Sequence, residues 1–319
     1  MIRFAWRQFR TQVVIAFGAL AVIAVLFALT RPHLIHLYKL HETDALLNSY
    51  GSLENIERLL LVVPVLIGVF WGAPLIAHEL EAGTHRLVWT QSVTRSRWLA
   101  VKLGLVGGAS AALAGLLSWT VTWWSAPVDH VNMDRLSSPF VFGERGLVPL
   151  GYAVFAFALG VVRGLLLRRT VPAMAATLTV FVAGRLAFGQ WVRPHLIAPV
   201  HTAVALTGAA IRGLSVSTSN GPLTVIVNAP RAGDWMVSSS SQYALDGAGK
   251  VVYRLGDELR NVPPSALGAH LAKLDLHVTV AYQPASRFWS FQIAETAIFL
   301  AVALALVAFC FWWVRRRLS

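Results

Sequence analysis

The chain has 319 residues, of which 56% are apolar and 13% are charged, and its formal net charge is +12. Ordinary soluble domains carry about 25% charged residues, so this composition and a mean hydropathy of +0.61 exclude that class. A basic chain invites a nucleic-acid partner, but the positions of the basic residues, taken up below, indicate a membrane protein instead.

Residues 1–12 form the first predicted element. Ile2, Trp6, Phe9 and Val13 recur at helical spacing on one face, with arginines on a neighbouring face. Such a helix would lie in the cytoplasmic interface of the membrane, with its arginines reaching lipid phosphates. The alternative is that these residues are the charged end of the first transmembrane helix.

Six apolar segments approach or exceed the roughly 17–25 residues that a helix needs to cross the hydrocarbon. The first resembles a secretory signal, but Thr30-Arg31-Pro32 offers no small-x-small cleavage site, so we expect an uncleaved helix. The fold class is therefore an all-α polytopic membrane protein with six transmembrane helices. The predicted spans are Val13–Leu29, Leu59–Ala77, Leu99–Trp124, Leu147–Leu167, Val171–Phe188 and Ile293–Trp313.

The basic residues follow the positive-inside rule when the N-terminus is cytoplasmic. The short outer loops carry few basic residues, and acids offset them. This asymmetry predicts a plasma-membrane protein with both termini in the cytoplasm, and we expect no nucleic-acid partner. The inner basic residues are Arg3, Arg7, Arg10, Arg86, Arg95, Arg97, Lys102, Arg163, Arg168, Arg169, Arg315, Arg316 and Arg317.

The long segment 189–290 is expected to form a small α+β extracytoplasmic domain between the fifth and sixth spans. Leu223–Asn228 and Leu276–Tyr282 have strand character. The resulting organisation is an interfacial helix at 1–12, spans one to five at 13–188, this domain at 189–290, and the sixth span with a basic tail at 291–319. Expected helices are Asp257–Val262 and Ser265–Leu274, and expected loops are Gly208–Gly221 and Ser238–Gly249.

The sequence lacks the patterns of common catalytic and metal sites. His78 and His85 are seven residues apart, whereas a zincin needs two histidines four apart, so we expect no metal site. The nearest approach to a phosphate-binding loop, Gly247-Ala-Gly-Lys-Val251, lacks the earlier glycine and the hydroxyl residue. We therefore expect no catalytic or cofactor-binding residues and no enzyme activity in this chain.

Besides Lys102, which is near the inner end of the third span and is grouped with the inner basic residues, three charged residues fall inside predicted spans, where charge is costly and often functional. They are Arg163, Arg185 and Glu295, each within a few turns of a span end. Since Arg185 and Glu295 both approach the outer surface, we hypothesise that they pair.

The loop 78–98 between spans two and three is unusually polar. Gly83 suits a helix C-terminus, Thr84 can cap a short helix that runs to Thr90, and Thr94 can cap span three. The short helix would present Leu87 and Trp89 amid charged residues, a mixture suited to a protein partner. The alternative is an inert interfacial connector.

The pattern Glu79-x-Glu81-x-Gly83-Thr84, followed by Leu87, Thr90-Gln-Ser-Val-Thr-Arg95 and Lys102, resembles the membrane subunits of type-2 ABC exporters (ABC-2), particularly the actinobacterial permeases. The approach Tyr282–Trp289 and the tail Trp312–Arg317 extend the resemblance along the chain. Many relatives have proline before the Ser/Thr-Arg pair, where this chain has Ser92.

The resemblance implies that Thr84–Thr90 is a coupling helix that inserts into a separate ATP-binding subunit, which would hold ATP and Mg²⁺. It also implies a dimer with a second permease copy or paralogue, set in membrane lipid. The rival hypothesis is a non-transporting scaffold or sensor whose ectodomain binds a ligand or partner. The residues expected to couple to the ATPase are Glu79, Glu81, Gly83, Thr84, Arg86, Leu87, Trp89 and Arg95.

Overall fold

The computed structural model describes residues 2–83, 94–132, 135–205, 211–216, 223–238, 240–241, 243–245, 251–254 and 276–317. The chain divides into two compact units. The first is helical and comprises Met1–Asn132, Pro139–Arg193 and Trp289–Ser319. The second comprises Met133–Ser138 and Pro194–Phe288, and its described part is mainly β-structure.

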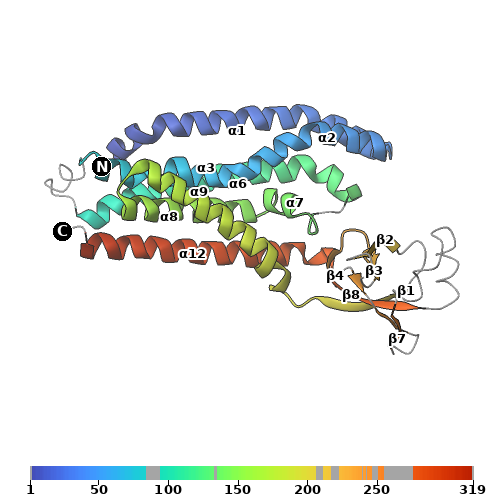
Figure 1. Cartoon of the computed structure of the whole chain (residues 1–319). Helices are drawn as coiled ribbons and strands as arrows, with labels where there is room; N and C mark the ends of the chain where they lie inside the picture. Colours follow the sequence, from blue (N-terminus) through green and yellow to red (C-terminus); the bar gives the residue numbers. More distant parts are fainter. Residues whose placement is uncertain are drawn as a thin grey trace. The chain divides into compact units, whose positions relative to one another are not determined.

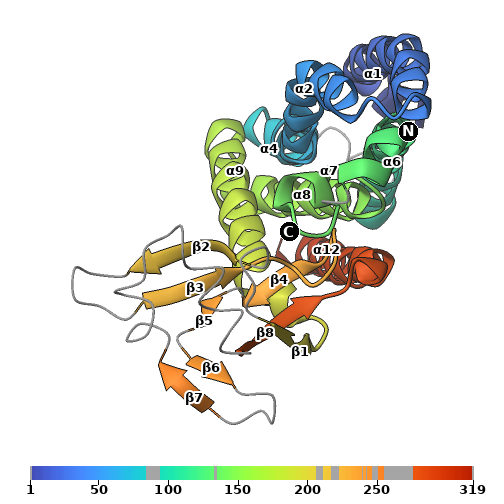
Figure 2. The same ribbon diagram turned by 90° about the vertical axis from the view of Figure 1, so that its right-hand side faces the viewer.

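Long helices make up the helical unit (Figure 1). Figure 2 shows α8 in the middle, with α4, α6, α9 and α12 around it and α1 and α2 on one edge. The helices are α1 (Ile2–Lys39), α2 (Thr43–Leu59), α3 (Val63–Leu66), α4 (Ala73–Glu81), α6 (Arg95–Asn132), α7 (Pro139–Glu144), α8 (Val148–Leu167), α9 (Thr170–Ala187) and α12 (Phe288–Arg317), with shorter turns η1 (Leu60–Val62), η2 (Ile67–Gly72), η3 (Phe188–Val192) and η4 (Arg193–His195).

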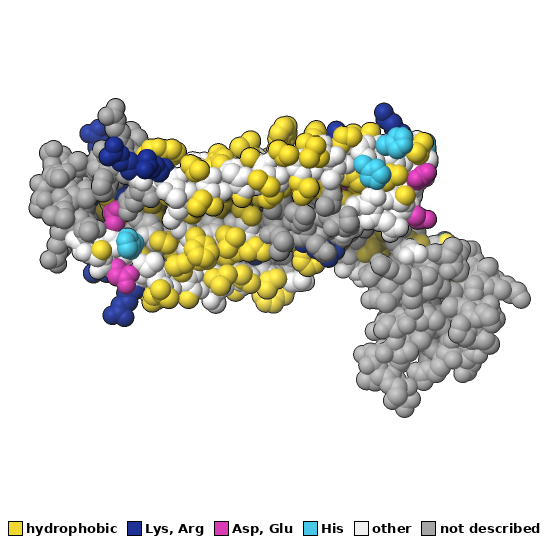
Figure 3. Space-filling model, turned by 90° about the horizontal axis from the view of Figure 1, so that it is seen from above, with side chains coloured by type: hydrophobic (Ala, Val, Ile, Leu, Met, Phe, Trp, Pro, Cys, Tyr) yellow, Lys and Arg dark blue, Asp and Glu magenta, His cyan; other side chains and the backbone are white. Residues whose placement is uncertain are grey.

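The described part of the chain contains six helices long and apolar enough to cross a membrane, which confirms the six predicted spans. On the face seen in Figure 3, hydrophobic side chains cover the middle of the helical unit, and charged and histidine side chains gather toward its two ends. The six helices are Phe9–Lys39, Val63–Glu81, Arg95–Val131, Val148–Leu167, Thr170–His195 and Ala285–Arg316.

The N-terminal segment is helical, as expected, but it continues without a break into the first span. α1 runs from Ile2 to Lys39 as one helix. Its polar side chains Arg7 and Arg10 are exposed at the start of this helix. This geometry agrees with the alternative considered from the sequence, in which residues 1–12 are the charged end of the first transmembrane helix.

The helix α2 is an element that the sequence did not predict. Its side chains Leu46 and Tyr50 are buried against Phe27 and Trp124, and the Tyr50 and Trp124 ring centroids are 5.4 Å apart. The acidic residues around it suggested a solvated outer loop. The helix forms because its apolar residues recur on one face, which packs on α1 and α6.

The second span is broken where the sequence placed prolines. Pro64 is the second residue of α3 and Pro74 is the second residue of α4, and the π-helical turn η2 lies between the two helices. Proline lacks the backbone N–H that continues a regular α-helical hydrogen-bond pattern. The turn lies against α8 at very close range, because a Cβ added at Gly160 would be 2.2 Å from the Gly68 carbonyl oxygen.

The described residues of the second unit form two antiparallel sheets. One has the order β1-β8-β6-β7 with β4 also paired to β8, and the other has the order β2-β3-β5. Val200 of β1 pairs with Tyr282 of β8. The strands are β1 (Val200–Ala205), β2 (Ile211–Val216), β3 (Leu223–Val227), β4 (Trp235–Ser238), β5 (Ser240–Ser241), β6 (Tyr243–Leu245), β7 (Val251–Arg254) and β8 (His277–Gln283).

Strands β3 and β8 confirm the two predicted strands. The expected loops Gly208–Gly221 and Ser238–Gly249 were partly wrong, because β2 lies in the first and β5 and β6 lie in the second. Pairing across the sheets overrides the Gly, Ser and Asp content that favoured loops. The predicted helices Asp257–Val262 and Ser265–Leu274 lie outside the described residues.

Candidate coupling site

The predicted coupling helix Thr84–Thr90, with Thr84, Arg86, Leu87 and Trp89, lies outside the described residues, as does Ser92. The structure describes the two flanks of this segment. We call the region formed by the last turn of α4, the first turn of α6 and the first turn of α9 the coupling end of the helical unit. Both chain termini are at this end (Figure 1).

Glu79 joins the second span to the third. Its side chain is 5% exposed, and Lys102 of α6, 4% exposed, donates from Nζ to Glu79 Oε1. Lys102 Nζ also donates to the Leu75 carbonyl oxygen at 3.4 Å, and it lies 5.0 Å from the centroid of the Trp98 ring. Removing one member of such a buried pair leaves an uncompensated charge, so this contact links α4 and α6 strongly.

Glu81 joins the second span to the fifth. Its exposed Oε2 accepts hydrogen bonds from the backbone N–H of Thr170 at 2.9 Å and from the Thr170 hydroxyl at 2.7 Å. Thr170 is the first residue of α9. The N-cap residue of this helix, Arg169, makes no capping hydrogen bond with its side chain. A carboxylate at a helix N-terminus satisfies a free N–H and interacts favourably with the helix dipole. Glu81 therefore caps α9 from a different helix.

The remaining described residues shape the chain on either side of residues 84–93. Gly83 has a φ of +70°, as expected for a glycine that ends a helix. On the other flank, Thr94 Oγ1 accepts a hydrogen bond from the Arg97 N–H at 3.4 Å, which supports its predicted role as the cap of the third span. Arg95 is the first residue of α6. The adjacent Ser96 accepts from Arg315 Nε at 3.1 Å, which ties α12 to the same end.

Small residues hold the second span against its neighbours next to this end. A Cβ added at Gly164 of α8 would lie 2.4 Å from the Ala73 carbonyl oxygen. Ala73 and Ala77 of α4 also form a buried cluster with Ala173 of α9. With backbones this close, a displacement of α4 cannot leave α8 and α9 in place.

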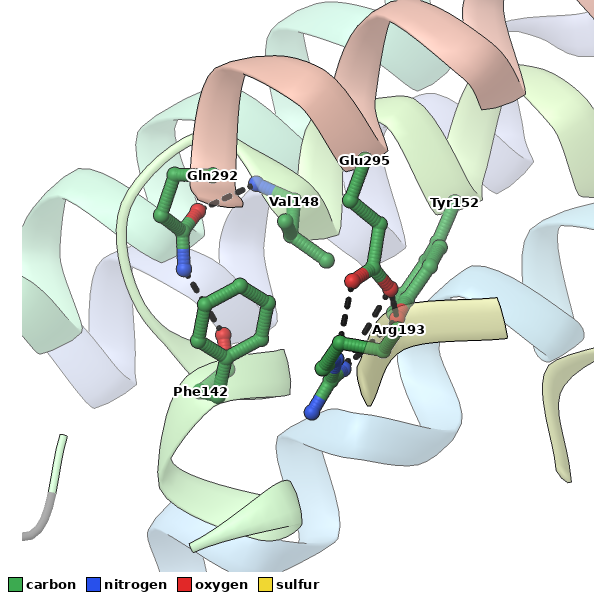
Figure 4. Close-up of polar contacts among 6 residues, drawn as sticks. All are labelled: Phe142, Val148, Tyr152, Arg193, Gln292 and Glu295. Carbon is green, nitrogen blue, oxygen red and sulfur yellow. Dashed lines mark hydrogen bonds and ion pairs between the residues drawn. The ribbon is translucent and has the colours of Figure 1, made fainter. Parts of the chain in front are cut away.

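At the opposite end of the helical unit, three buried polar side chains meet (Figure 4). Arg193 Nε donates to Glu295 Oε2 at 2.9 Å, and Tyr152 donates from its hydroxyl to Glu295 Oε1. Arg193 is 4% exposed and Glu295 is 0% exposed. This cluster joins the fourth, fifth and sixth spans, and we call it the buried ionic cluster.

The hypothesis that Arg185 pairs with Glu295 was wrong, because Arg193 occupies that position. The Arg185 guanidinium instead lies over the Tyr152 ring, 4.9 Å from its centroid. Sequence reasoning ended the fifth span at Phe188, so it placed Arg193 in the extracytoplasmic domain 189–290. The apolar residues Trp191 and Val192 were the signal that the helical path continues.

Gln292, one helical turn before Glu295, caps the fourth span. Its Oε1 accepts hydrogen bonds from the N–H groups of Leu147 and Val148, both at 2.9 Å, and its Nε2 donates to the Phe142 carbonyl oxygen at 3.0 Å. Figure 4 shows Gln292 and Glu295 extending from the same helix toward these partners. α12 thus binds the start of α8 through Gln292 and the Tyr152 side chain of α8 through Glu295, one helical turn later.

A family model described as ABC-2 membrane transporter related matches residues 17–193, which is more than half of the chain. The chain belongs to this family. The match includes the last turn of α4 and the first turns of α6 and α9, which form the coupling end. No curated protein and no solved structure matched the chain.

Family membership and the six apolar helices make this ABC-2 protein a multi-pass transporter permease, a membrane subunit and not a catalytic one. The family also implies partnership with an ATP-binding subunit. The narrower resemblance to actinobacterial permeases stays a prediction. Lys102 belongs to the sequence pattern that resembles the family. Its pairing with Glu79, and the contact between Glu81 and Thr170, could be recognised only from the packing of the helices.

Proposed function

We propose that this chain is the permease subunit of an ABC exporter and that residues 84–93 receive the motion of a separate ATP-binding subunit. That partner would hold ATP and Mg²⁺ and carry out hydrolysis. The observation that carries the proposal is the pair of acidic contacts just before this segment: Glu79 bonds to the third span and Glu81 bonds to the fifth. A push on the segment would therefore reach three spans at once.

The contacts suggest how the motion spreads. Gly83 ends α4 with a φ of +70°, a conformation that glycine adopts without strain, so the helix before it has a defined end. Displacement of α4 would draw α6 through the buried Glu79–Lys102 pair and α9 through Glu81. Close backbone packing at Gly164 would carry α8 with them. Closure of the ATPase would thereby alternate the access of the substrate path or squeeze substrate outward.

In the proposed orientation, the chain sits in the plasma membrane with both termini in the cytoplasm and the β-unit on the outer side. Two features support it. The basic residues are concentrated in the segments assigned to the inside, and both termini lie at the coupling end (Figure 1). An ATP-binding subunit can reach residues 84–93 only from the cytoplasm. A second permease copy or paralogue would complete the path.

The test uses the full chain co-expressed with the ATP-binding subunit encoded beside it and reconstituted in vesicles. We expect the two proteins to co-purify and the ATPase rate to rise when the permease is present. The variants Glu79→Lys and Gly83→Pro should lower the stimulated rate several-fold, because they disturb the buried pair and the helix end.

A matched control is Glu42→Lys, an exposed acidic residue at the far end of α1. Its stimulated rate should equal that of the wild type. If the two subunits never associate, or if all three variants behave alike, the coupling proposal is wrong and a scaffold or sensor role becomes the better explanation.

A further inference from the structure

A large apolar cavity lies between the first span and the broken second span. Its volume is about 540 Å³, and its walls come from α1, from the α3–α4 region and from α6. Gln12 is the polar exception among the described lining residues. Representative apolar lining residues are Ile15, Ala19, Ile67, Phe70 and Leu113.

A second cavity of about 300 Å³ continues from the first toward the coupling end. The two share the lining residues Gln12, Phe70, Trp71 and Pro74, so they adjoin, and we refer to them together as the groove. His78 and Lys102 line the smaller cavity, and no acidic residue is among its described lining residues. The groove therefore changes from apolar to polar along its length, with its basic lining residues at the coupling end.

The ammonium of Lys102 can bind one more acceptor. An ammonium carries three N–H donors. Within the described part of the chain, two of them are directed at Glu79 Oε1 and the Leu75 carbonyl oxygen. The exposed guanidinium groups of Arg7 and Arg10 belong to the first turns of α1, which also contribute Phe9 and Gln12 to the smaller cavity. Because Glu79 neutralises Lys102, the net positive charge near this position comes from Arg7 and Arg10, and this charge together with the third Lys102 donor favours an acidic group.

The apolar part of the groove opens to the surface that faces membrane lipid. Among its lining residues, Ile15 is 67% exposed and Phe70 is 52% exposed. A ligand could therefore enter sideways from the hydrocarbon without crossing water. An apolar space beside a bilayer gains contacts when a hydrocarbon chain fills it.

We propose that this groove binds a single-chain amphiphile from the membrane, with its acyl chain in the larger cavity and its acidic headgroup beside Lys102. The volume of the larger cavity, about 540 Å³, lies in the range of pockets that hold one small ligand, and its apolar walls suit a single acyl chain. The change from apolar to polar lining along the groove sets the orientation, with the headgroup toward the coupling end.

This proposal names a ligand class for the membrane subunit and rests on its place in the bilayer, not on the ATP-binding partner. Binding can be measured on the permease alone, so failure of the coupling proposal would leave it untouched. If the ligand is also the exported substrate, its headgroup would lie beside the same Lys102–Glu79 pair that we assign to coupling.

The test is photo-crosslinking of the full chain in nanodiscs of neutral phosphatidylcholine that contain a diazirine-labelled palmitate. We expect labelled peptides from α1 and the α3–α4 region. Ala19→Phe should reduce this labelling about fivefold by filling the groove, whereas Val22→Phe, on an exposed position of α1 that does not line the groove, should leave it unchanged. Both variants must elute as the wild type does, so that misfolding is not mistaken for loss of the site.

Competition tests the headgroup. Oleate should displace the label about tenfold better than oleyl alcohol, which has the same chain but no charge, because a charge-assisted hydrogen bond is the stronger kind. The double variant Glu79→Gln/Lys102→Met should remove this preference without leaving a lone buried charge.

Three results would overturn the proposal. Equal labelling of the Ala19→Phe and Val22→Phe variants, or uniform labelling of all lipid-facing helices, would show ordinary annular lipid. Displacement by phosphatidylglycerol but not by oleate would exclude a single-chain ligand. Efficient crosslinking between two copies that carry Ile15→Cys in a Cys310→Ser background, with no lipid labelling, would show that a second copy covers the groove.

Discussion

At the end of the helical unit away from residues 84–93, Glu295 binds Arg193 and Tyr152 with all three side chains buried. At the coupling end, one contact is a buried ion pair and the other, between Glu81 and Thr170, is exposed to solvent. Breaking a buried ion pair by removing one partner costs about 3–5 kcal/mol, whereas exposed pairs contribute about 0–1 kcal/mol. The opposite end therefore has the character of a fixed anchor, whereas at the coupling end the Glu81–Thr170 contact can be broken at low cost while the Glu79–Lys102 pair stays in place.

The largest effect of a substitution is expected at the buried ionic cluster, where the difference between the two ends can be tested most directly. We expect Glu295→Leu to lower the free energy of unfolding by about 3–5 kcal/mol, because it leaves the Arg193 guanidinium buried without its carboxylate. The measurement is thermal unfolding of the purified chain in detergent.

The control for this prediction is the double variant Glu295→Leu/Arg193→Met. Removing both charges should recover most of the lost stability, because apolar replacement of a buried pair is often neutral. If the double variant is as unstable as Glu295→Leu, the cluster acts through shape and not through charge.

The second prediction concerns the close packing that connects the two ends. Gly160→Val should destabilise the chain by about 1–3 kcal/mol or more, since a Cβ there would meet the Gly68 carbonyl oxygen at 2.2 Å and the Ala73 nitrogen at 2.7 Å. Gly108→Val is the matched control in α6, where a Cβ meets nothing within 4 Å. Comparable unfolding temperatures for the two variants would contradict the observed packing.

Gly83→Ala should have a smaller effect, a loss of about 1 kcal/mol, because its φ of +70° is costly for a residue with a Cβ. Gly83→Asn should be tolerated better, since asparagine adopts this conformation more readily. Equal stability of all three proteins, measured by thermal unfolding, would show that α4 does not need to end in this way.

Glu81→Ala should change stability least and still affect function. The carboxylate is exposed, so we expect the unfolding temperature to stay close to that of the wild type. The ATPase stimulation by the permease should nevertheless fall, because α9 loses its cap from α4. If this variant lost stability and kept full ATPase stimulation, Glu81 would serve stability and not coupling, which would contradict the proposed difference between the two ends.

Much of the membrane topology could be predicted because lipid imposes a strong and local rule. A helix that crosses hydrocarbon must satisfy its own backbone and present about 20 apolar residues, and both features can be read from consecutive residues. Proline also acts locally: Pro64 and Pro74 lie in the first turns of α3 and α4, on either side of the π-helical turn in the second span. The ends of the spans were less certain, as the extension of α9 toward Arg193 shows.

The partners of the polar residues could not be predicted in the same way. Glu79 and Lys102 are 23 residues apart in sequence, Glu81 and Thr170 are 89 apart, and Arg193 and Glu295 are 102 apart. Such pairs depend on which helices become neighbours and on the rotation of each helix. The helix α2 was not predicted because its acidic residues suggested a solvated loop. Its buried face could be recognised only from its packing on α1 and α6.

The sequence by itself determined the class of protein, the number of spans, the family resemblance and the position of the polar segment between spans two and three. Each of these depends on local composition or on a short motif. The tertiary structure decided that Glu79 and Glu81 bind different helices, that Arg193 and not Arg185 neutralises Glu295, and that a groove with basic residues at one end lies beside α1. These features arise from the packing of helices distant in sequence, because a buried charge is stable only where another helix brings its partner within reach.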